Sequence, residues 1–133
     1  MGKWIGVDLD GTLAEYHGSM GKAIGRPILP MLEMVQALLR SGIEVRIFTA
    51  RASDPDQIPA IRQWLGWHGL AGCAVTNVKD FDCHLIIDDR AARAVWNRGE
   101  HCPGCRSESL RRMEQLGLKG WPAHRGQSSI SQL

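Results

Sequence analysis

The chain has 133 residues, of which 44% are hydrophobic and 23% are charged, and its formal net charge is +2. These values are typical of a globular protein with room for one hydrophobic core. A membrane-spanning protein is excluded, because no apolar run in the sequence approaches the ~20 residues that a span requires. The sequence contains no dense run of Lys and Arg of the kind that would indicate a nucleic-acid-binding protein. The first residues lack an apolar signal core, so we expect a cytoplasmic protein with reduced cysteines.

The charge is unevenly distributed along the chain. Residues 1–89 contain eight Lys and Arg against eleven Asp and Glu, whereas residues 90–133 contain eight against three. The first part therefore has a net charge of −3 and the second part a net charge of +5. The basic part could bind an anionic partner, and a solvated surface explains it equally well.

The first half of the chain predicts a strand, a loop, a helix and a second strand. Residues 3–9 form a short apolar run typical of a buried strand, which Gly11 ends. Residues 14–30 contain three Gly and two Pro, a composition that predicts a loop. Apolar residues at helical spacing predict a helix over 31–41, and the next apolar run predicts a strand over 43–49.

The second half continues the alternation. Asp54 can cap a helix whose first position is a proline, and helical spacing carries that helix to about residue 67. Short apolar runs at 73–76 and 84–87 predict the third and fourth strands. Two more helices are expected, at 91–97 and 107–116.

Strands that alternate with helices predict an α/β domain with a mostly parallel sheet and right-handed crossovers. We expect a Rossmann-like, doubly wound sheet with strand order 3-2-1-4, which places the switch point between strands one and four. Residues 1–99 would form this domain. Residues 100–133 would form an appendage with one helix and a mobile end rich in Gly, Ser and Gln.

Each predicted strand is followed by a polar side chain that could bind a metal or a phosphate. In a parallel sheet the carboxyl ends of the strands share one edge, where ligands bind. That edge should collect four carboxylates, a hydroxyl and an ammonium, from Asp8, Asp10, Asp88, Asp89, Thr49 and Lys79. Clustered carboxylates repel one another unless a cation neutralises them, and Mg²⁺ prefers such oxygen ligands. A hydroxyl and an ammonium can stabilise a phosphoryl group, so the sequence predicts magnesium-dependent phosphoryl transfer.

The order of these residues resembles that of a known family. The segment Asp8-Leu9-Asp10-Gly11-Thr12-Leu13, followed by Thr49, Lys79 and Asp88-Asp89, looks like the four ordered motifs of the haloacid dehalogenase (HAD) superfamily. The resemblance covers residues 3–99. It implies that Asp8 attacks phosphorus and forms an aspartyl-phosphate, and that Asp10 acts as general acid and then general base.

The resemblance also implies the ligands of the site. Thr49 and Lys79 would hold the phosphoryl oxygens. Mg²⁺ would be bound by Asp8, by the backbone carbonyl of Asp10 and by Asp88, with Asp89 as a further ligand or as a partner of the ligands.

The second carboxylate of the first motif indicates the reaction class. In the family, Asp at the position of Asp10 is typical of phosphatases and phosphomutases, and a carboxylic acid can protonate a leaving alkoxide. Arg51 could bind a second anionic group of the substrate, or could lie on the surface where the next helix starts. The segment 49–51 is most similar to small bacterial or phage phosphatases and to the phosphatase part of polynucleotide kinases.

Family members often carry a cap domain in one of two windows. Here the windows, 14–30 and 50–77, are too short, because even a minimal domain needs ~40 residues. We therefore expect an open site, unless residues 100–133 or a second copy of the chain cover it. An open site favours a macromolecular phosphate, such as a nucleic-acid end, over a small metabolite.

Two other classes of protein remain as alternatives. A phospho-receiver signalling module uses the same residue types, but in the order acidic pair, Asp, Thr, Lys, which differs from the order here. A non-catalytic phosphate-binding protein with a degenerate site is the other alternative. Cys102 and Cys105 could be half of a zinc site, but the sequence lacks a second pair at structural spacing, so we expect no zinc.

Overall fold

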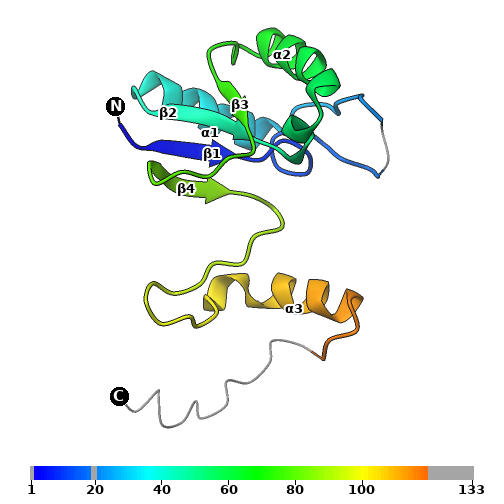
Figure 1. Cartoon of the computed structure of the whole chain (residues 1–133), viewed down its shortest axis with the longest axis vertical. Helices are drawn as coiled ribbons and strands as arrows, with labels where there is room; N and C mark the ends of the chain where they lie inside the picture. Colours follow the sequence, from blue (N-terminus) through cyan, green and yellow to red (C-terminus); the bar gives the residue numbers. More distant parts are fainter. Residues whose placement is uncertain (1, 19–20, 120–133) are drawn as a thin grey trace. The chain divides into compact units, whose positions relative to one another are not determined.

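The computed structural model describes residues 2–18 and 21–119. The chain divides into two compact units, 1–89 and 90–133 (Figure 1). The division lies after Asp89, whereas the sequence placed the end of the first domain at residue 99. Residues 90–99 thus group with the second unit, and the charge asymmetry follows the division, with −3 on the first unit and +5 on the second.

Unit 1 is an α/β domain with a Rossmann-like parallel sheet. Its strands are β1 (Trp4–Val7), β2 (Glu44–Phe48), β3 (Ala74–Thr76) and β4 (Cys83–Ile87). All pairs are parallel and the order is β3-β2-β1-β4, which confirms the predicted strand order. The order reverses between β1 and β4, so the switch point lies between these two strands, as expected.

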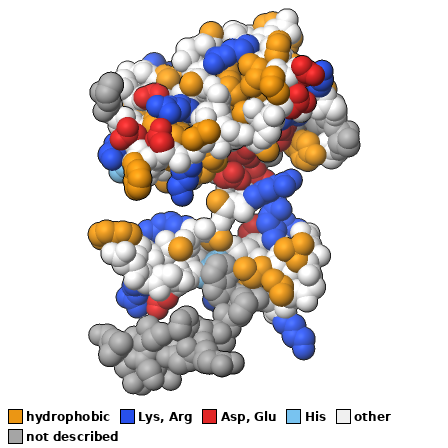
Figure 2. Space-filling view, in the orientation of Figure 1, with side chains coloured by type: hydrophobic (Ala, Val, Ile, Leu, Met, Phe, Trp, Pro, Cys, Tyr) orange, Lys and Arg blue, Asp and Glu red, His pale blue; other side chains and the backbone are white. Residues whose placement is uncertain are grey.

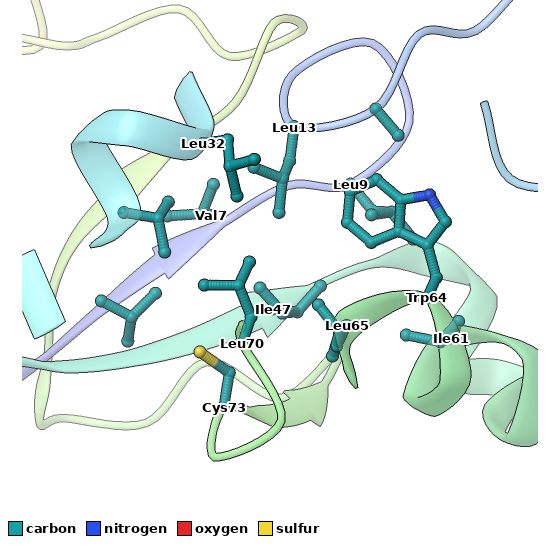
Figure 3. Close-up of a cluster of buried hydrophobic side chains, with 13 residues drawn as sticks. Val7, Leu9, Leu13, Leu32, Ile47, Ile61, Trp64, Leu65, Leu70 and Cys73 are labelled. Atoms are coloured by element: carbon teal, nitrogen blue, oxygen red, sulfur yellow. The ribbon is translucent and has the colours of Figure 1, made fainter. Parts of the chain in front are cut away.

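Two helices build the hydrophobic core of unit 1. They are α1 (Leu29–Arg40) and α2 (Ile58–Trp67), and a 3-10 turn at Pro55–Gln57 precedes α2. Side chains of both helices pack against one another and against β1 and β2, as Figure 3 shows; the cluster includes Val7, Leu32, Val35, Val45, Ile47, Ile61, Trp64 and Leu65. Burial of each large side chain contributes about 1.5–3 kcal/mol, and this core fixes the carboxyl ends of β1 and β2.

The opposite face of the sheet buries Trp4, the first residue of β1. Its side chain has no exposed surface, and its indole N–H donates to Asp80 Oδ1 at 2.8 Å. The Arg46 guanidinium lies 4.5 Å from the indole centroid. Asp80 belongs to the connection 77–82, which runs from the end of β3 to the start of β4, where the Trp4 amide donates to the Asp82 carbonyl. Six residues therefore cross this face, with no room for a helix.

Unit 2 differs from expectation in one element. Residues 91–97 form no helix; a bridge joins Ala94 to His101, and the Cys102 amide donates to the Arg93 carbonyl. Asn97 and Gly99 both have positive φ, 61° and 68°, which favours a tight turn over a helix. The last predicted helix is confirmed as α3 (Arg106–Gln115), preceded by a 3-10 turn at Pro103–Cys105.

Two further expectations concern the end of the chain and membrane-spanning helices. The Gly, Ser and Gln-rich end falls in 120–133, outside the residues that the structure describes. Among the described helices, none has both the length and the apolar character that a membrane span requires.

Candidate active site

The carboxyl ends of β1 and β4 bring three carboxylates together. The Asp8 amide donates to the Ile87 carbonyl at 2.9 Å, which extends the pairing of the two strands to the edge of the sheet. One carboxylate oxygen each from Asp8, Asp88 and Asp89 lies within 4.8 Å of the others. Figure 2 shows acidic side chains gathered at one edge of unit 1. Three of the four predicted carboxylates thus form one cluster.

A tight turn after β1 positions this cluster. The Leu9 carbonyl accepts hydrogen bonds from the amides of Thr12, Leu13 and Ala14 at 3.2, 2.9 and 2.8 Å. Leu9 and Leu13 are fully buried, so hydrophobic packing holds both ends of the turn. Gly11 has φ +87°, and a Cβ at this position would lie 2.8 Å from Asp89 Oδ2. Glycine is therefore needed here both for the backbone conformation and for the approach of Asp89.

Thr12 is part of the site, although the sequence pattern assigned it no role of its own. Its side chain is 7% exposed. The hydroxyl donates to Asp89 Oδ1 at 2.9 Å, and it lies 3.4 Å from Asp8 Oδ2. It accepts a hydrogen bond from the Asp89 amide at 3.0 Å. A hydroxyl at a turn residue two positions after Asp10 is the signal that could have identified it.

The crowding of carboxylates changes the acidity of Asp8. Burial raises the pKa of Asp8 to about 7, helped by a hydrogen bond with Asp89 and by the negative charges of Asp88 and Asp89. Without a counterion the cluster therefore favours a bound proton on Asp8. A cation at the same place would remove that preference.

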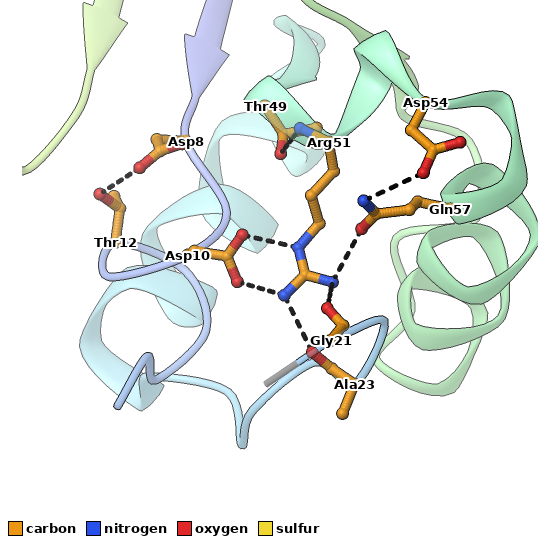
Figure 4. Close-up of polar contacts among 9 residues, drawn as sticks. All are labelled: Asp8, Asp10, Thr12, Gly21, Ala23, Thr49, Arg51, Asp54 and Gln57. Atoms are coloured by element: carbon orange, nitrogen blue, oxygen red, sulfur yellow. Dashed lines mark hydrogen bonds and ion pairs between the residues drawn. The ribbon is translucent and has the colours of Figure 1, made fainter. Parts of the chain in front are cut away.

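The Asp10 carboxylate points toward Arg51, as Figure 4 shows, and is not part of the cluster. Arg51 Nε donates to Asp10 Oδ2 at 2.7 Å, and Arg51 Nη2 donates to Asp10 Oδ1 at 2.8 Å. This bidentate pair is largely enclosed, with 9% of the Arg51 side chain and 22% of the Asp10 side chain exposed. Hydrogen bonding to the Asp10 carboxylate raises the pKa of Arg51, so the guanidinium stays charged.

Thr49 closes β2 and starts the next turn. Its side chain is 2% exposed, and its hydroxyl oxygen accepts a hydrogen bond from the Arg51 amide at 3.1 Å. Its own amide donates to the Thr76 carbonyl at 2.9 Å, which joins the ends of β2 and β3. Thr49 thus lies at the expected end of its strand, where it also caps the 3-10 turn Ala50–Ser53.

Lys79 lies in the connection between β3 and β4 and is exposed. The structure does not bring it into contact with Asp8 or the other described carboxylates of the site. It stands between Val78, whose amide bonds the Thr76 hydroxyl, and Asp80, which is held by Trp4. Among the described residues it makes no hydrogen bond or ion pair, so its ammonium is available to a ligand.

The residues of the cluster fit a hard divalent cation. Three carboxylate oxygens offer the charge and the donor type that Mg²⁺ prefers. The raised pKa of Asp8 shows that the cluster is unfavourable as three bare anions. In the described part of the chain, no cluster that includes Cys102 or Cys105 offers three such ligand atoms.

Comparisons with known proteins add little to this geometry. The sequence matches no protein-family model and no curated protein. One solved structure, of a conserved protein from Bacteroides thetaiotaomicron, is similar over 88% of this chain and 96% of its own, at 19% identity and a TM-score of 0.49. The fold and the candidate site therefore rest on the chain itself.

Proposed function

We propose that this protein is a magnesium-dependent phosphatase of the HAD type that uses Asp8 as its nucleophile. The observation that carries the proposal is the cluster of Asp8, Asp88 and Asp89 at the switch point of the sheet, with Asp10 two residues from the nucleophile. Ligands of open α/β sheets bind at this point. A phosphate dianion cannot approach three bare carboxylates, so the proposal includes a cation.

Asp8, Asp88 and Asp89 would hold the Mg²⁺. When bound, Mg²⁺ would neutralise the carboxylates and the negative charge of the substrate. Thr12 supports this role, because its hydroxyl bonds the carboxylate and the amide of Asp89 and so fixes one of the ligands. Residues that orient ligands in this way usually affect metal affinity.

The reaction would proceed in two steps on the protein's own side chains. In the first step an oxygen of Asp8 attacks phosphorus, the bond from phosphorus to the leaving oxygen breaks, and Asp10 gives a proton to that oxygen. In the second step Asp10 takes a proton from water, whose oxygen attacks phosphorus. The bond from phosphorus to Asp8 then breaks, which releases inorganic phosphate and restores Asp8.

Two more side chains would bind the phosphoryl group. The Thr49 hydroxyl accepts from the Arg51 amide, and its hydrogen would be donated to a phosphoryl oxygen. The exposed ammonium of Lys79 would offset the charge of that group. In the structure Lys79 has no other partner among the described residues, whereas Arg51 is fully engaged. We therefore assign phosphate binding to Lys79 and not to Arg51.

The substrate we propose is a phosphate monoester on a large molecule, such as a nucleic-acid end. The connections after β1 and β2 are turns and short 3-10 segments in the part of the chain that the structure describes, and neither contains a folded insertion. Without a folded insertion in the described parts of these two connections, remote parts of a small substrate contribute little binding energy. The net charge of +5 on residues 90–133 favours an anionic polymer.

Release of phosphate from an aryl phosphate, with Mg²⁺ and with excess EDTA, tests the proposal. We expect activity with Mg²⁺, none with EDTA, and none for Asp8→Asn at either condition, because an amide is a very poor nucleophile. Asp56→Asn, on the exposed surface, is the matched control and should keep wild-type kcat. A long-lived phosphoprotein without turnover would instead indicate a signalling module, and binding of phosphate without either would indicate a binding protein.

A further inference from the structure

All five N–H donors of the Arg51 guanidinium are used within the protein. Two donate to the carboxylate of Asp10, as described above. Of the others, one donates to the Ala23 carbonyl at 2.9 Å, one to the Gly21 carbonyl at 3.5 Å and one to Gln57 Oε1 at 3.2 Å. A guanidinium has five donors, so none is left for a phosphate. The sequence offers Arg51 as a substrate-binding residue, and this geometry argues for a different role.

These contacts join three parts of the chain that are distant in sequence (Figure 4). Asp10 belongs to the turn after β1, Gly21 and Ala23 belong to the loop that leads to α1, and Gln57 closes the 3-10 turn before α2. Gln57 is itself held, because its Nε2 donates to Asp54 Oδ2 at 3.5 Å.

Arg51 also has a fixed backbone. Its amide donates to the Thr49 hydroxyl, and the Ala52 amide donates to the Thr49 carbonyl at 3.1 Å. The side chain therefore extends from a turn anchored on β2 and is enclosed by its partners, with 9% of its surface exposed.

We propose that Arg51 is a positioning residue that sets the orientation of Asp10 and anchors the loop 21–27 beside it. This inference rests on the proposed function, in which Asp10 moves the protons. A bidentate guanidinium uses one lone pair on each carboxylate oxygen and leaves the other for a proton. Arg51 thus fixes the plane of the Asp10 carboxylate and leaves one lone pair on each of its oxygens.

The dependence of kcat/KM on the leaving group separates positioning from substrate binding. An aryl phosphate with an acidic phenol needs no general acid in the first step, whereas an alkyl phosphate does. For Arg51→Ala we expect kcat/KM to fall at least about tenfold more for the alkyl than for the aryl substrate. The double variant Asp10→Asn/Arg51→Ala should be no slower than Asp10→Asn alone on the alkyl substrate.

Two variants and one additive keep the result interpretable. Arg51→Lys retains the positive charge but lacks the paired N–H donors of the guanidinium. It should fold, and its kcat/KM should also fall more for the alkyl than for the aryl substrate, by a smaller factor than in Arg51→Ala. Guanidinium ion at concentrations below those that unfold the protein should restore activity of Arg51→Ala on the alkyl substrate. Arg62→Ala is the matched control, because Arg62 bonds the carbonyls of Ala71 and Cys73 on the exposed side of α2, and it should leave both substrates unchanged.

The positioning role would be overturned if Arg51→Ala lowered kcat/KM equally for both substrates, through a higher KM, and if its effect multiplied that of Asp10→Asn in the double variant. Such a result would leave the phosphatase assignment intact. If the wild-type protein hydrolyses no phosphate ester, the proposed function fails. The anchoring can then be judged from amide hydrogen exchange of Glu15, whose amide donates to the Arg26 carbonyl at 2.8 Å and closes this loop. We expect faster exchange in Arg51→Ala than in Arg62→Ala, and equal rates would overturn the inference.

Discussion

Thr12 and Asp89 exchange two hydrogen bonds: the Thr12 hydroxyl donates to the Asp89 carboxylate at 2.9 Å, and the Asp89 amide donates back to that hydroxyl at 3.0 Å. The two residues come from opposite ends of unit 1 in sequence, the turn after β1 and the end of β4. Their contact closes the site at the switch point. It also selects one orientation of the Asp89 carboxylate, which is one of the proposed metal ligands.

Replacement of Thr12 by valine should weaken metal binding. Valine keeps the branched shape but has no hydroxyl, so the Asp89 carboxylate loses its donor and the Asp89 amide loses its acceptor. We expect the Kd for Mg²⁺ to rise about tenfold or more, as for other residues that orient metal ligands. Calorimetric titration of the metal-free protein measures this. Thr12→Ser keeps the hydroxyl and should bind Mg²⁺ nearly as the wild type does; equal affinity in Thr12→Val would show that the contact has no part in the metal site.

Replacement of Gly11 by alanine tests the close approach of Asp89. The new Cβ would lie 2.8 Å from Asp89 Oδ2, so the carboxylate must move. Gly42→Ala is the matched control, because Gly42 also has a positive φ, +81°, but a Cβ there would meet nothing within 4 Å. Both variants should lose about 1–2 kcal/mol of stability from backbone strain. Thermal unfolding with and without Mg²⁺ should show that Gly42→Ala keeps the stabilisation by metal and Gly11→Ala loses it.

The pKa of Asp8 predicts how the metal-free protein responds to pH. This carboxyl has a pKa of about 7 in the folded protein and 3.8 as its ordinary value. Between these values the folded protein binds a proton that the unfolded chain releases. The contribution of Asp8 to the free energy of unfolding therefore falls as the pH rises toward 7.

Thermal unfolding in EDTA between pH 5 and pH 8 measures this effect as the difference between the wild type and Asp8→Asn. The wild type should lose more stability over this range than the variant. Mg²⁺ competes with the proton, so its stabilisation of the wild type should be greater at pH 8 than at pH 5. The same pH dependence in both proteins would contradict the assignment of the raised pKa to Asp8.

Lys79 provides a test of the phosphate-binding role. Loss of its ammonium in Lys79→Ala should lower kcat/KM by about 10²–10³-fold, as for other groups that stabilise developing charge. The thermal stability should change little, because the side chain is exposed and the connection is held by Asp80 and Asp82. Lys22→Ala is a control for the loss of one positive charge. A loss below tenfold would show that the phosphoryl group is held without Lys79.

The strands and their order could be predicted from the sequence because short apolar runs alternate with helical spacing, and each run ends in a polar residue. The helix expected at 91–97 does not form, because Asn97 and Gly99 adopt a turn that local periodicity does not reveal. The division after Asp89 could not be predicted for the same reason, since a helix at 91–97 would have completed the first domain.

The carboxylate cluster could be predicted because the ends of β1 and β4 are fixed by topology. The contacts that the side chains of the site make with one another could not be predicted from the sequence. Arg51 uses its donors on two backbone carbonyls and on side chains far away in sequence, which no spacing rule reveals. The role of Thr12 depends on Asp89, 77 residues later in the chain.

The indole N–H of Trp4 donates a hydrogen bond to Asp80, the residue that follows Lys79. The connection 77–82 is short, so a movement of the Lys79 backbone toward a phosphate would be transmitted to Asp80 and from there to the Trp4 N–H. The indole resonance of Trp4 should thus shift when phosphate and Mg²⁺ are both present, although Trp4 begins its strand at the edge of the sheet remote from the cluster. The buried indole of Trp4 should therefore serve as a spectroscopic reporter of ligand binding.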